Sequence, residues 1–304
     1  MKTCMPPDPN PRKPTFTPPP GACDAHCHVF GPASVFPYHP TSSYIPPDAP
    51  AAKLAELHRF LGIDRAVIVQ ASCHGPDNRA MLAAIASSGG RYRGVCIADS
   101  SFRSSDFEEL DRGGVRGVRF NFVKHLGGAP DLDFIESVVR MVEPLGWHLV
   151  VHVNAEDLIE HEPFFSRFQL PIVVDHMGRV PVSQGVDQEA FKILLSRLER
   201  DNWWVKVCGA ERISADGHPF LDAVPFARAL IEVAPDRVLW GTDWPHPNIR
   251  KWMPNDGDLV DLLPQFAPDE ETRRKILVGN PARLYGWGTT NLSGRSDDDC
   301  SLQL

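Results

Sequence analysis

Ala66-Val67-Ile68-Val69 is an uninterrupted run of four apolar residues, and Leu149-Val150-Val151 and Ile172-Val173-Val174 are shorter runs of the same kind. A strand with one face in water alternates apolar and polar residues, whereas a strand buried on both faces is apolar throughout. The three runs therefore indicate a parallel sheet that is covered on both faces.

Segments of strand and helix character alternate on either side of these runs. The segments with strand character are residues 22–30, 65–70, 92–99, 115–122, 148–154, 172–178, 203–209 and 237–244. Segments with apolar residues at helical spacing are residues 51–61, 79–87, 134–145, 188–201 and 224–234. This alternation predicts an α/β protein with a single (β/α)8 TIM barrel over residues 21–287. An open doubly wound sheet is the alternative, but it normally has a Gly-rich turn after its first strand, and His28-Val29-Phe30-Gly31-Pro32 is not such a turn.

The two ends of the chain differ in composition from the predicted barrel. The 304 residues include 29 prolines, which cluster in residues 6–20 and 37–50. We expect residues 1–20 to be a proline-rich tail and residues 31–50 to be a long loop that covers the barrel mouth. Residues 288–304 are polar and acidic, and we expect them to be a disordered tail.

The charge balance restricts the classes of partner. The chain has 31 Lys and Arg residues against 39 Asp and Glu residues, for a net charge of -8. We therefore expect no nucleic-acid or membrane partner, and an anionic ligand would have to be held by locally placed arginines. The N-terminus lacks the apolar core of an export signal and the 7 cysteines form no CxxC pair, so we expect a cytosolic protein without a disulfide framework. The sequence does not decide between a monomer and a homo-oligomer.

Polar residues occur late in several predicted strands, where the active site of a (β/α)8 barrel lies. His26 and His28 are two residues apart at the end of the first strand, so both imidazoles point to the same side. A lone strand histidine is more often a hydrogen-bonded structural residue, but two adjacent buried imidazoles need a common partner. With His152 on the fifth strand and Asp243 on the eighth, they predict a divalent-metal site, with Zn2+ as the first choice and Mn2+, Fe2+ or Co2+ as alternatives.

A metal at this place would favour hydrolysis or decarboxylation, because it polarises a carbonyl group and lowers the pKa of water. His176, at the end of the sixth strand, is a fifth ligand, a core histidine or, as we expect, an acid/base group that orients water or the carbonyl oxygen. Lys206 is either a salt-bridged barrel residue or a contact for a carboxylate.

Four segments of the sequence resemble the amidohydrolase superfamily. They are Asp24-Ala25-His26-Cys27-His28-Val29-Phe30-Gly31-Pro32, Val118-Arg119-Phe120-Asn121-Phe122-Val123, Val174-Asp175-His176-Met177-Gly178-Arg179 and Leu239-Trp240-Gly241-Thr242-Asp243-Trp244-Pro245-His246-Pro247. The resemblance covers residues 21–287 and is closest to the branch of 2-pyrone-4,6-dicarboxylate hydrolases and 4-sulfomuconolactone hydrolases. It implies a (β/α)8 barrel with a hydrolytic site.

The resemblance also implies a role for each matching residue. Asp243 would be the general base that takes a proton from water and delivers it to the leaving oxygen, and His176 would help to polarise the carbonyl group. His26 and His28 match the metal positions of the superfamily. The implied substrate contacts are Arg119 and Arg212, which would hold carboxylates, and Tyr44, His74 and Asn248, which would line the pocket. A guanidinium fork suits this task because it binds a planar carboxylate through two hydrogen bonds.

Two positions depart from the metal-independent pyrone-dicarboxylate lactonases of this branch. His152 stands where those enzymes carry a tyrosine, which favours a metal-dependent enzyme. His125 stands where an arginine is expected, which removes one cation and favours 4-sulfomuconolactone or another anionic lactone as the substrate. His125 remains a candidate contact for an acid group through hydrogen bonds or, when protonated, through its charge.

We therefore predict a metal-dependent hydrolase that opens the ring of a small anionic lactone in the degradation of aromatic compounds. The metal ligands would be His26, His28, His152 and Asp243, with a weak and long contact from Asp243. The alternatives are a metal-dependent decarboxylase of an aromatic or unsaturated acid, and a non-catalytic organic-acid binding protein.

Overall fold

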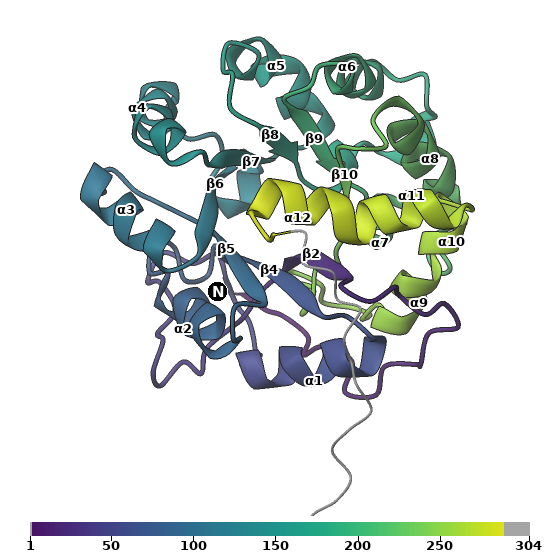
Figure 1. Ribbon diagram of the computed structural model, residues 1–304, viewed down its shortest axis with the longest axis horizontal. Helices are drawn as coiled ribbons and strands as arrows, with labels where there is room; N and C mark the ends of the chain where they lie inside the picture. The colour runs from purple at the N-terminus through teal and green to yellow at the C-terminus, as the bar shows by residue number, and fades with distance from the viewer. Residues whose placement is uncertain (1, 289–304) are drawn as a thin grey trace, which may run out of the picture.

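The chain folds into a ring of eight parallel strands that is surrounded by helices (Figure 1). The computed structural model describes residues 2–288, so the tail expected at residues 288–304 lies, apart from Gly288, outside the described residues. The strands of the ring are β2 (Cys23–Cys27), β4 (Arg65–Val69), β5 (Tyr92–Cys96), β6 (Val115–Asn121), β7 (His148–His152), β8 (Ile172–Val174), β9 (Trp203–Lys206) and β10 (Val238–Leu239). Each of the predicted strand segments contains one of these strands, which confirms the predicted (β/α)8 barrel.

Backbone hydrogen bonds between the last and the first strand close the ring. Ala25 N donates to the Trp240 carbonyl at 2.8 Å, and Asp243 N donates to the His26 carbonyl at 2.7 Å. A Cβ atom at Gly241 would come within 2.5 Å of the His26 nitrogen, so a side chain at this position would hold the two strands apart. The seam therefore depends on glycine, and it brings Asp243 next to the end of β2.

Most helices cover the outside of the ring, and the last one lies across its amino-terminal end (Figure 1). They are α1 (Ala51–Leu61), α2 (Arg79–Ser87), α3 (Ser104–Arg112), α4 (Leu132–Val142), α5 (Ala155–Phe165), α6 (Glu189–Leu198), α7 (Ala210–Ile213), α8 (Val224–Val233), α9 (Asp256–Asp261), α10 (Leu263–Phe266), α11 (Glu270–Arg274) and α12 (Asn280–Tyr285). The predicted bounds of the first two helices agree with α1 and α2. Among the described residues, none of the helices combines the length and the apolar character needed to cross a membrane.

The apolar runs that predicted the parallel sheet are buried on both faces, as expected. Val67 and Val69 pack inside the ring with Val150, whereas Ala66 and Ile68 belong to the outer core that the helices cover. This alternation follows from the geometry of a strand, in which successive side chains point to opposite faces. Two separate apolar layers therefore hold the strands in place.

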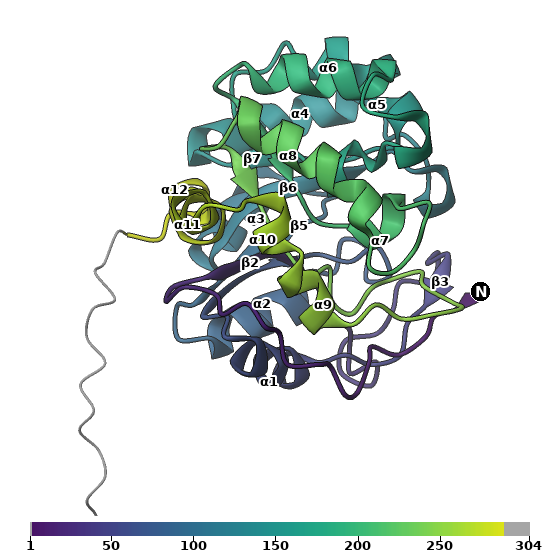
Figure 2. The ribbon, with the colours of Figure 1, turned by 90° about the vertical axis from the view of Figure 1, so that its right-hand side faces the viewer.

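The last helix closes the amino-terminal end of the ring. The Tyr285 ring at the end of α12 lies 5.0 Å from the His148 ring at the start of β7. Arg65 and Arg93 lie over the Trp287 ring that follows α12, at 5.5 and 5.0 Å from its centre. Figure 2 shows α12 at the opposite end of the barrel from β3 (Tyr44–Ile45) and the N-terminus. The carboxyl-terminal end is therefore the side that remains for a ligand.

Residues 2–20, which we expected to be a tail, lie along the barrel and are called the N-terminal strap below. Its strand β1 (Lys2–Thr3) pairs with β3, and Met5 N donates to the Ile249 carbonyl at 3.0 Å. Further along the strap, the Arg12 side chain pairs with Asp258 and Asp261 of α9. Hydrogen bonds and ion pairs thus attach this proline-rich segment to the barrel mouth and to α9.

Candidate active site

A cavity of about 360 Å³ opens at the carboxyl ends of the strands. Eight of the residues predicted from the sequence line it, namely His28, Tyr44, Arg119, His152, His176, Arg212, Asp243 and Asn248. They come from strands and loops that are far apart in the chain, and the closed ring brings them to one end, as expected for this fold.

His26, His28 and Asp243 form a buried cluster, of which His28 and Asp243 line the cavity. The Nε2 atom of His28 lies 3.1 Å from Oδ1 of Asp243, and the Nε2 atom of His26 lies 3.5 Å from the same oxygen. Asp243 has a positive φ of 62°, a backbone conformation that is rare for a residue with a side chain. Strain of this kind gathers at functional sites, where the surrounding structure holds it in place.

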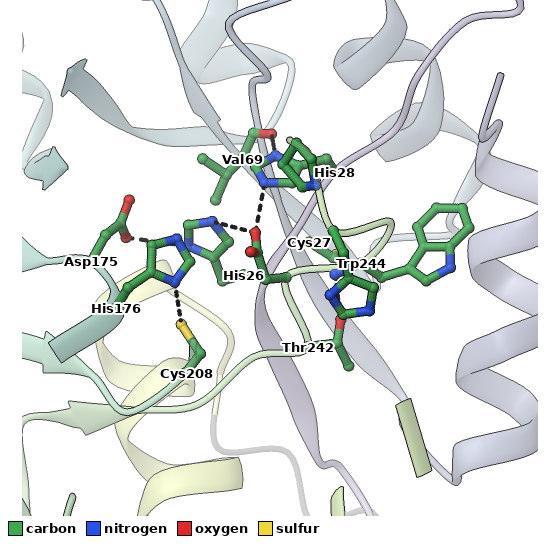
Figure 3. Close-up of polar contacts among 12 residues, drawn as sticks. His26, Cys27, His28, Val69, Asp175, His176, Cys208, Thr242 and Trp244 are labelled. Atoms are coloured by element: carbon green, nitrogen blue, oxygen red, sulfur yellow. Dashed lines mark hydrogen bonds and ion pairs between the residues drawn. The ribbon is translucent and has the colours of Figure 1, made fainter. Parts of the chain in front are cut away.

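The hydrogen bond of His28 fixes the tautomer of its ring. Nδ1 lies 2.7 Å from the carbonyl oxygen of Val69, which can only accept, so Nδ1 carries the proton (Figure 3). A neutral His28 ring then directs the lone pair of Nε2 at the carboxylate oxygen of Asp243. Two lone pairs in this position repel each other unless a proton or a cation lies between them.

The same cluster fits a divalent metal ion. The candidate ligand atoms of His26, His28 and Asp243 all lie within 4.8 Å of one another. The buried Nε2 atom of His26 has no hydrogen-bond partner within residues 2–288, while its Nδ1 atom lies 3.2 Å from Oδ1 of Asp175 and 3.0 Å from Nζ of Lys206. Two imidazole nitrogens and a carboxylate oxygen form a donor set that zinc prefers, and a carboxylate behind a ligating histidine is its usual support.

His152, the fourth predicted ligand, lies outside this cluster. None of the groups of candidate ligands found among the described residues includes it. Its Nδ1 atom lies 2.5 Å from Oδ1 of Asn121, its ring lies 5.4 Å from the His176 ring, and its buried Nε2 atom has no partner in the described part of the chain. The fold thus brings His152 to the cavity but not into the three-residue cluster.

The second oxygen of Asp243 is held by an arginine. Arg212 Nε donates to Oδ2 at 2.6 Å, and its Nη2 contacts the same oxygen. Burial raises the pKa of Asp243, but Arg212 and the neighbouring imidazoles outweigh burial and hold that pKa well below its ordinary value. Asp243 is therefore ionised at neutral pH, with one oxygen engaged and the other facing the two histidines.

A second buried carboxylate lies behind His26. Lys206, which is fully buried, places its Nζ atom 3.1 Å from Oδ1 of Asp175 and 3.0 Å from Nδ1 of His26. Arg119 Nε donates to the other oxygen of Asp175 at 2.9 Å. Of the two alternatives left open for Lys206, the salt-bridged barrel residue is therefore the one observed, and Arg119 has a carboxylate partner of its own.

A left-handed turn after β8 presents His176 to the cavity. His176, Met177, Gly178 and Arg179 all have positive φ values, between 48° and 67°. Left-handed backbone costs roughly 1–2 kcal/mol for a residue with a Cβ atom, so packing must hold this turn in place. The Cβ atom of a side chain at Gly209 would come 2.8 Å from the His176 ring, which shows how closely the chain packs there.

The Cys208 thiol lies against one ring nitrogen of His176. Its Sγ atom lies 3.3 Å from Nδ1 of His176 (Figure 3). Burial raises the pKa of the Cys208 thiol well above its ordinary value, and burial lowers the pKa of His176 well below its ordinary value. A neutral thiol that donates to Nδ1 of a neutral imidazole leaves the proton on Nε2, so His176 offers a donor at the cavity.

One predicted substrate contact with a described side chain, His74, is not among the residues that line the cavity. His74 is buried, accepts a hydrogen bond from Gly31 N at 3.3 Å and lies 3.3 Å from the Pro37 carbonyl, so it holds the loop over residues 31–37. His125 belongs to the short helix Lys124–Leu126, and its side chain lies outside the described part of the structure.

Sequence reasoning missed three polar residues of the cavity wall, Ser72, Arg179 and Arg250. Arg179 ends one of the four recognised motifs, so its position in that motif was a usable signal. Ser72 and Arg250 lie on loops, and no local pattern marks them. With Arg119 and Arg212, four arginines of the described residues line the cavity, in a chain whose net charge is -8.

Comparison with known proteins now places the chain in a family. A family model described as amidohydrolase matches residues 23–287. The chain belongs to the amidohydrolase family. This finding confirms the resemblance drawn from the four motifs.

Several relatives of known name are similar over nearly their whole length. The chain is 49% identical to a 2-pyrone-4,6-dicarboxylate hydrolase of Comamonas testosteroni, over 91% of this chain and 93% of that protein. It is 43% identical to a 4-sulfomuconolactone hydrolase of Hydrogenophaga intermedia, over 89% and 90% of the two chains. A probable 2-pyrone-4,6-dicarboxylic acid hydrolase of Acinetobacter baumannii, solved with citric acid bound, is 26% identical with a TM-score of 0.78, over 88% of this chain and 100% of that chain.

Proposed function

We propose that this amidohydrolase is a lactone hydrolase that opens a small anionic lactone of the 2-pyrone-4,6-dicarboxylate or 4-sulfomuconolactone type in the degradation of aromatic compounds. The observation that carries the proposal is a cavity that combines the carboxylate of Asp243, beside two imidazoles, with four arginines. An acidic chain that gathers cations in one cavity is built for an anionic ligand. The names of the relatives, and the citric acid held by one of them, support this choice.

Asp243 and His176 would carry the proton transfer and the carbonyl activation. Asp243 accepts a proton from the attacking water on the oxygen that Arg212 leaves free, and later returns it to the ring oxygen that leaves. The Nε2 proton of His176 points to the position of the lactone carbonyl oxygen, where negative charge develops as water adds. Arg119 and Arg212 orient the acid groups so that the carbonyl carbon meets the water.

A divalent metal ion, Zn2+ as the first choice and Mn2+ as the alternative, would be held by His26, His28 and Asp243, with His152 as the remaining candidate ligand. When bound, it would supply Lewis acidity to the lactone carbonyl or to the attacking water. The lowered pKa of Asp243 gives a reason for this help, because a weak base takes a proton slowly from unactivated water.

A direct assay tests the proposed activity. The purified protein is incubated with 2-pyrone-4,6-dicarboxylate and with 4-sulfomuconolactone, and ring opening is followed by absorbance, with and without a chelator, beside elemental analysis. We expect hydrolysis of at least one lactone, loss of activity with the chelator, and recovery with added Zn2+ or Mn2+. Failure to open either lactone contradicts the proposed function. Full activity after removal of all metal contradicts the proposed metal requirement and leaves the proposed function standing.

Replacement of Asp243 by Asn tests its role. The variant keeps the shape of the side chain and its contact with Arg212 but cannot accept a proton, so we expect turnover to fall by about 10³-fold. Affinity for the substrate, measured by calorimetry, should stay within a few-fold of the wild type. Unchanged turnover of the Asp243→Asn variant would refute the mechanism. Release of carbon dioxide by the wild type, in place of ring opening, would show that the protein is a decarboxylase.

A further inference from the structure

The residues on either side of Asp243 are held by a network of hydrogen bonds. Asp243 has a positive φ of 62°, and left-handed backbone is unfavourable for a residue with a Cβ atom. The backbone nitrogen of Thr242 donates to Oδ1 of Asp24 at 3.0 Å, and the backbone nitrogen of Trp244 donates to the Thr242 hydroxyl at 3.0 Å. These two bonds fix the chain directly before and directly after Asp243.

The Thr242 hydroxyl joins this turn to a buried carboxylate. The backbone nitrogen of Trp244 can only donate, so the hydroxyl oxygen accepts from it and keeps its own proton for Oδ2 of Asp24, at 2.6 Å. The backbone and the side chain of Thr242 therefore hold one oxygen each of the same carboxylate. Asp24 lies in β2 and is fully buried, so water does not compete for these bonds.

Asp24 also joins the end of β2 and the helix α1 to the same turn. Its Oδ1 atom accepts from His26 N at 3.0 Å, and its Oδ2 atom lies 3.2 Å from Nε2 of His58 in α1. A Cβ atom at Gly241 would come 2.8 Å from Oδ1, so glycine is needed for this close approach. Asp24, Cys27 and His58 lie within 4.8 Å of one another, but two hydrogen-bond contacts on each oxygen of Asp24 leave little capacity for an ion.

His58 is a polar residue on the buried face of α1. The other buried residues of this helix are Leu54, Leu57 and Leu61. His58 is 3% exposed, and its Nδ1 atom has no hydrogen-bond partner in the described part of the chain. An imidazole with an unsatisfied buried nitrogen is unfavourable, so packing alone does not account for a histidine among leucines. The bond from Nε2 to Asp24 accounts for it.

We propose that His58, Asp24 and Thr242 are positioning residues for Asp243. Their contacts lock the turn in which Asp243 has its positive φ, and they thereby hold Oδ1 of Asp243 3.1 Å from Nε2 of His28. None of the three positioning residues lines the cavity, so they act through Asp243 and not on the substrate. This inference rests on the proposed function, since it takes Asp243 to be the general base.

Variants of the three positioning residues test the proposal. Thr242→Val removes the hydroxyl group at nearly constant volume, whereas Thr242→Ser retains it. His58→Leu removes the donor on α1, and Asp24→Asn places an amide where the hydrogen-bond donors need an acceptor. Leu54→Ala, on the same buried face of α1, is the control for loss of stability alone. Steady-state kinetics on the lactone and urea unfolding are measured for each protein.

We expect Thr242→Val to lower kcat by about 10- to 100-fold and to leave KM within about threefold, because a misplaced base affects the transition state more than binding. His58→Leu should give a smaller loss, and Thr242→Ser should keep most of kcat. Leu54→Ala should unfold at lower urea with kcat within about twofold of the wild type. If Asp24→Asn does not fold by circular dichroism, Thr242→Val and His58→Leu decide the question.

A double variant shows whether the effect passes through Asp243. In the Asp243→Asn background the base is already lost, so Thr242→Val should cause no further loss of turnover. An equal loss in both backgrounds would overturn the proposal, and so would a Thr242→Val variant with the kcat of the wild type.

Crystal structures of the same variants separate this inference from the proposed function. In Thr242→Val the distance from Oδ1 of Asp243 to Nε2 of His28 should increase from 3.1 Å, whether or not a lactone is opened. A wild type that opens no lactone, with Asp243 displaced in Thr242→Val, would defeat the proposed function and leave the positioning role standing. A wild type that opens a lactone, with Asp243 in place and kcat unchanged in Thr242→Val, would defeat the inference alone.

Discussion

Asp243 has two carboxylate oxygens, and the fold gives them different partners. Oδ2 is engaged by Arg212, whereas Oδ1 faces the Nε2 atoms of His26 and His28. At the residue scale, the hydrogen-bond partners of a side chain decide which of its atoms can donate or accept a proton. His176 is the second example, because the Cys208 thiol on its Nδ1 atom leaves Nε2 as the donor at the cavity.

Replacement of Cys208 by Ala tests this assignment. Without the thiol donor, His176 is free to place its proton on Nδ1, so we expect kcat to fall by about 10-fold while KM changes little. Cys208→Ser should retain most of the activity, because a hydroxyl group also donates. Steady-state kinetics gives the split, and ¹⁵N NMR of the imidazole gives the tautomer. A tautomer that is the same in all three proteins would show that Cys208 only packs against the ring.

Elements position these residues, and two of them are irregular. The left-handed turn after β8 carries both His176 and Arg179 to the cavity. The N-terminal strap joins two segments of the cavity rim, because β1 pairs with β3, which contains Tyr44, and Met5 bonds Ile249. The sequence predicted the regular strands well, but its proline-rich composition gave no sign that the strap would bind the rim.

Deletion of residues 2–5 tests the role of the strap. Tyr44 and the loop with Asn248 and Arg250 would lose their shared support, so we expect KM to rise several-fold with a smaller change in kcat. Arg12→Ala is the matched control, since it releases the strap at α9, away from the cavity, and should lower thermal stability without raising KM. Equal KM values for the deletion and the wild type would contradict this role.

At the scale of the whole molecule, the ring buries titratable groups as well as apolar ones. His148 lies at the closed end, next to Tyr285 and against Gly117, where a Cβ atom would come 2.6 Å from its ring. Burial lowers the pKa of His148 from 6.5 to about 3. The barrel therefore keeps this imidazole neutral, whereas the unfolded chain would protonate it in mild acid.

The pH dependence of stability tests this statement. Between pH 6.5 and pH 3 the unfolded state binds a proton at His148 that the native state does not, so the contribution of His148 to stability falls as the pH falls through this window. The loss amounts to about 1.5 kcal/mol between pH 6.5 and pH 5. Urea unfolding should show that His148→Asn, which cannot titrate, loses about this much less than the wild type over the same interval. Parallel curves for the two proteins would contradict the lowered pKa.

The sequence by itself determined the barrel, the strands that form it and the strand-end residues His26, His28 and Asp243. These depend on local patterns, because a single segment shows both the apolar pattern of a strand and the polar residues at its carboxyl end, where the active site of such a barrel lies. Only the tertiary structure decided the partners. It paired Arg212 with Asp243 and Arg119 with Asp175, turned His74 toward a loop and tied Thr242 to Asp24. The physical reason is that ion pairs and tautomers depend on atoms that meet within about 3 Å, and loops far apart in the chain bring those atoms together only after the ring has closed.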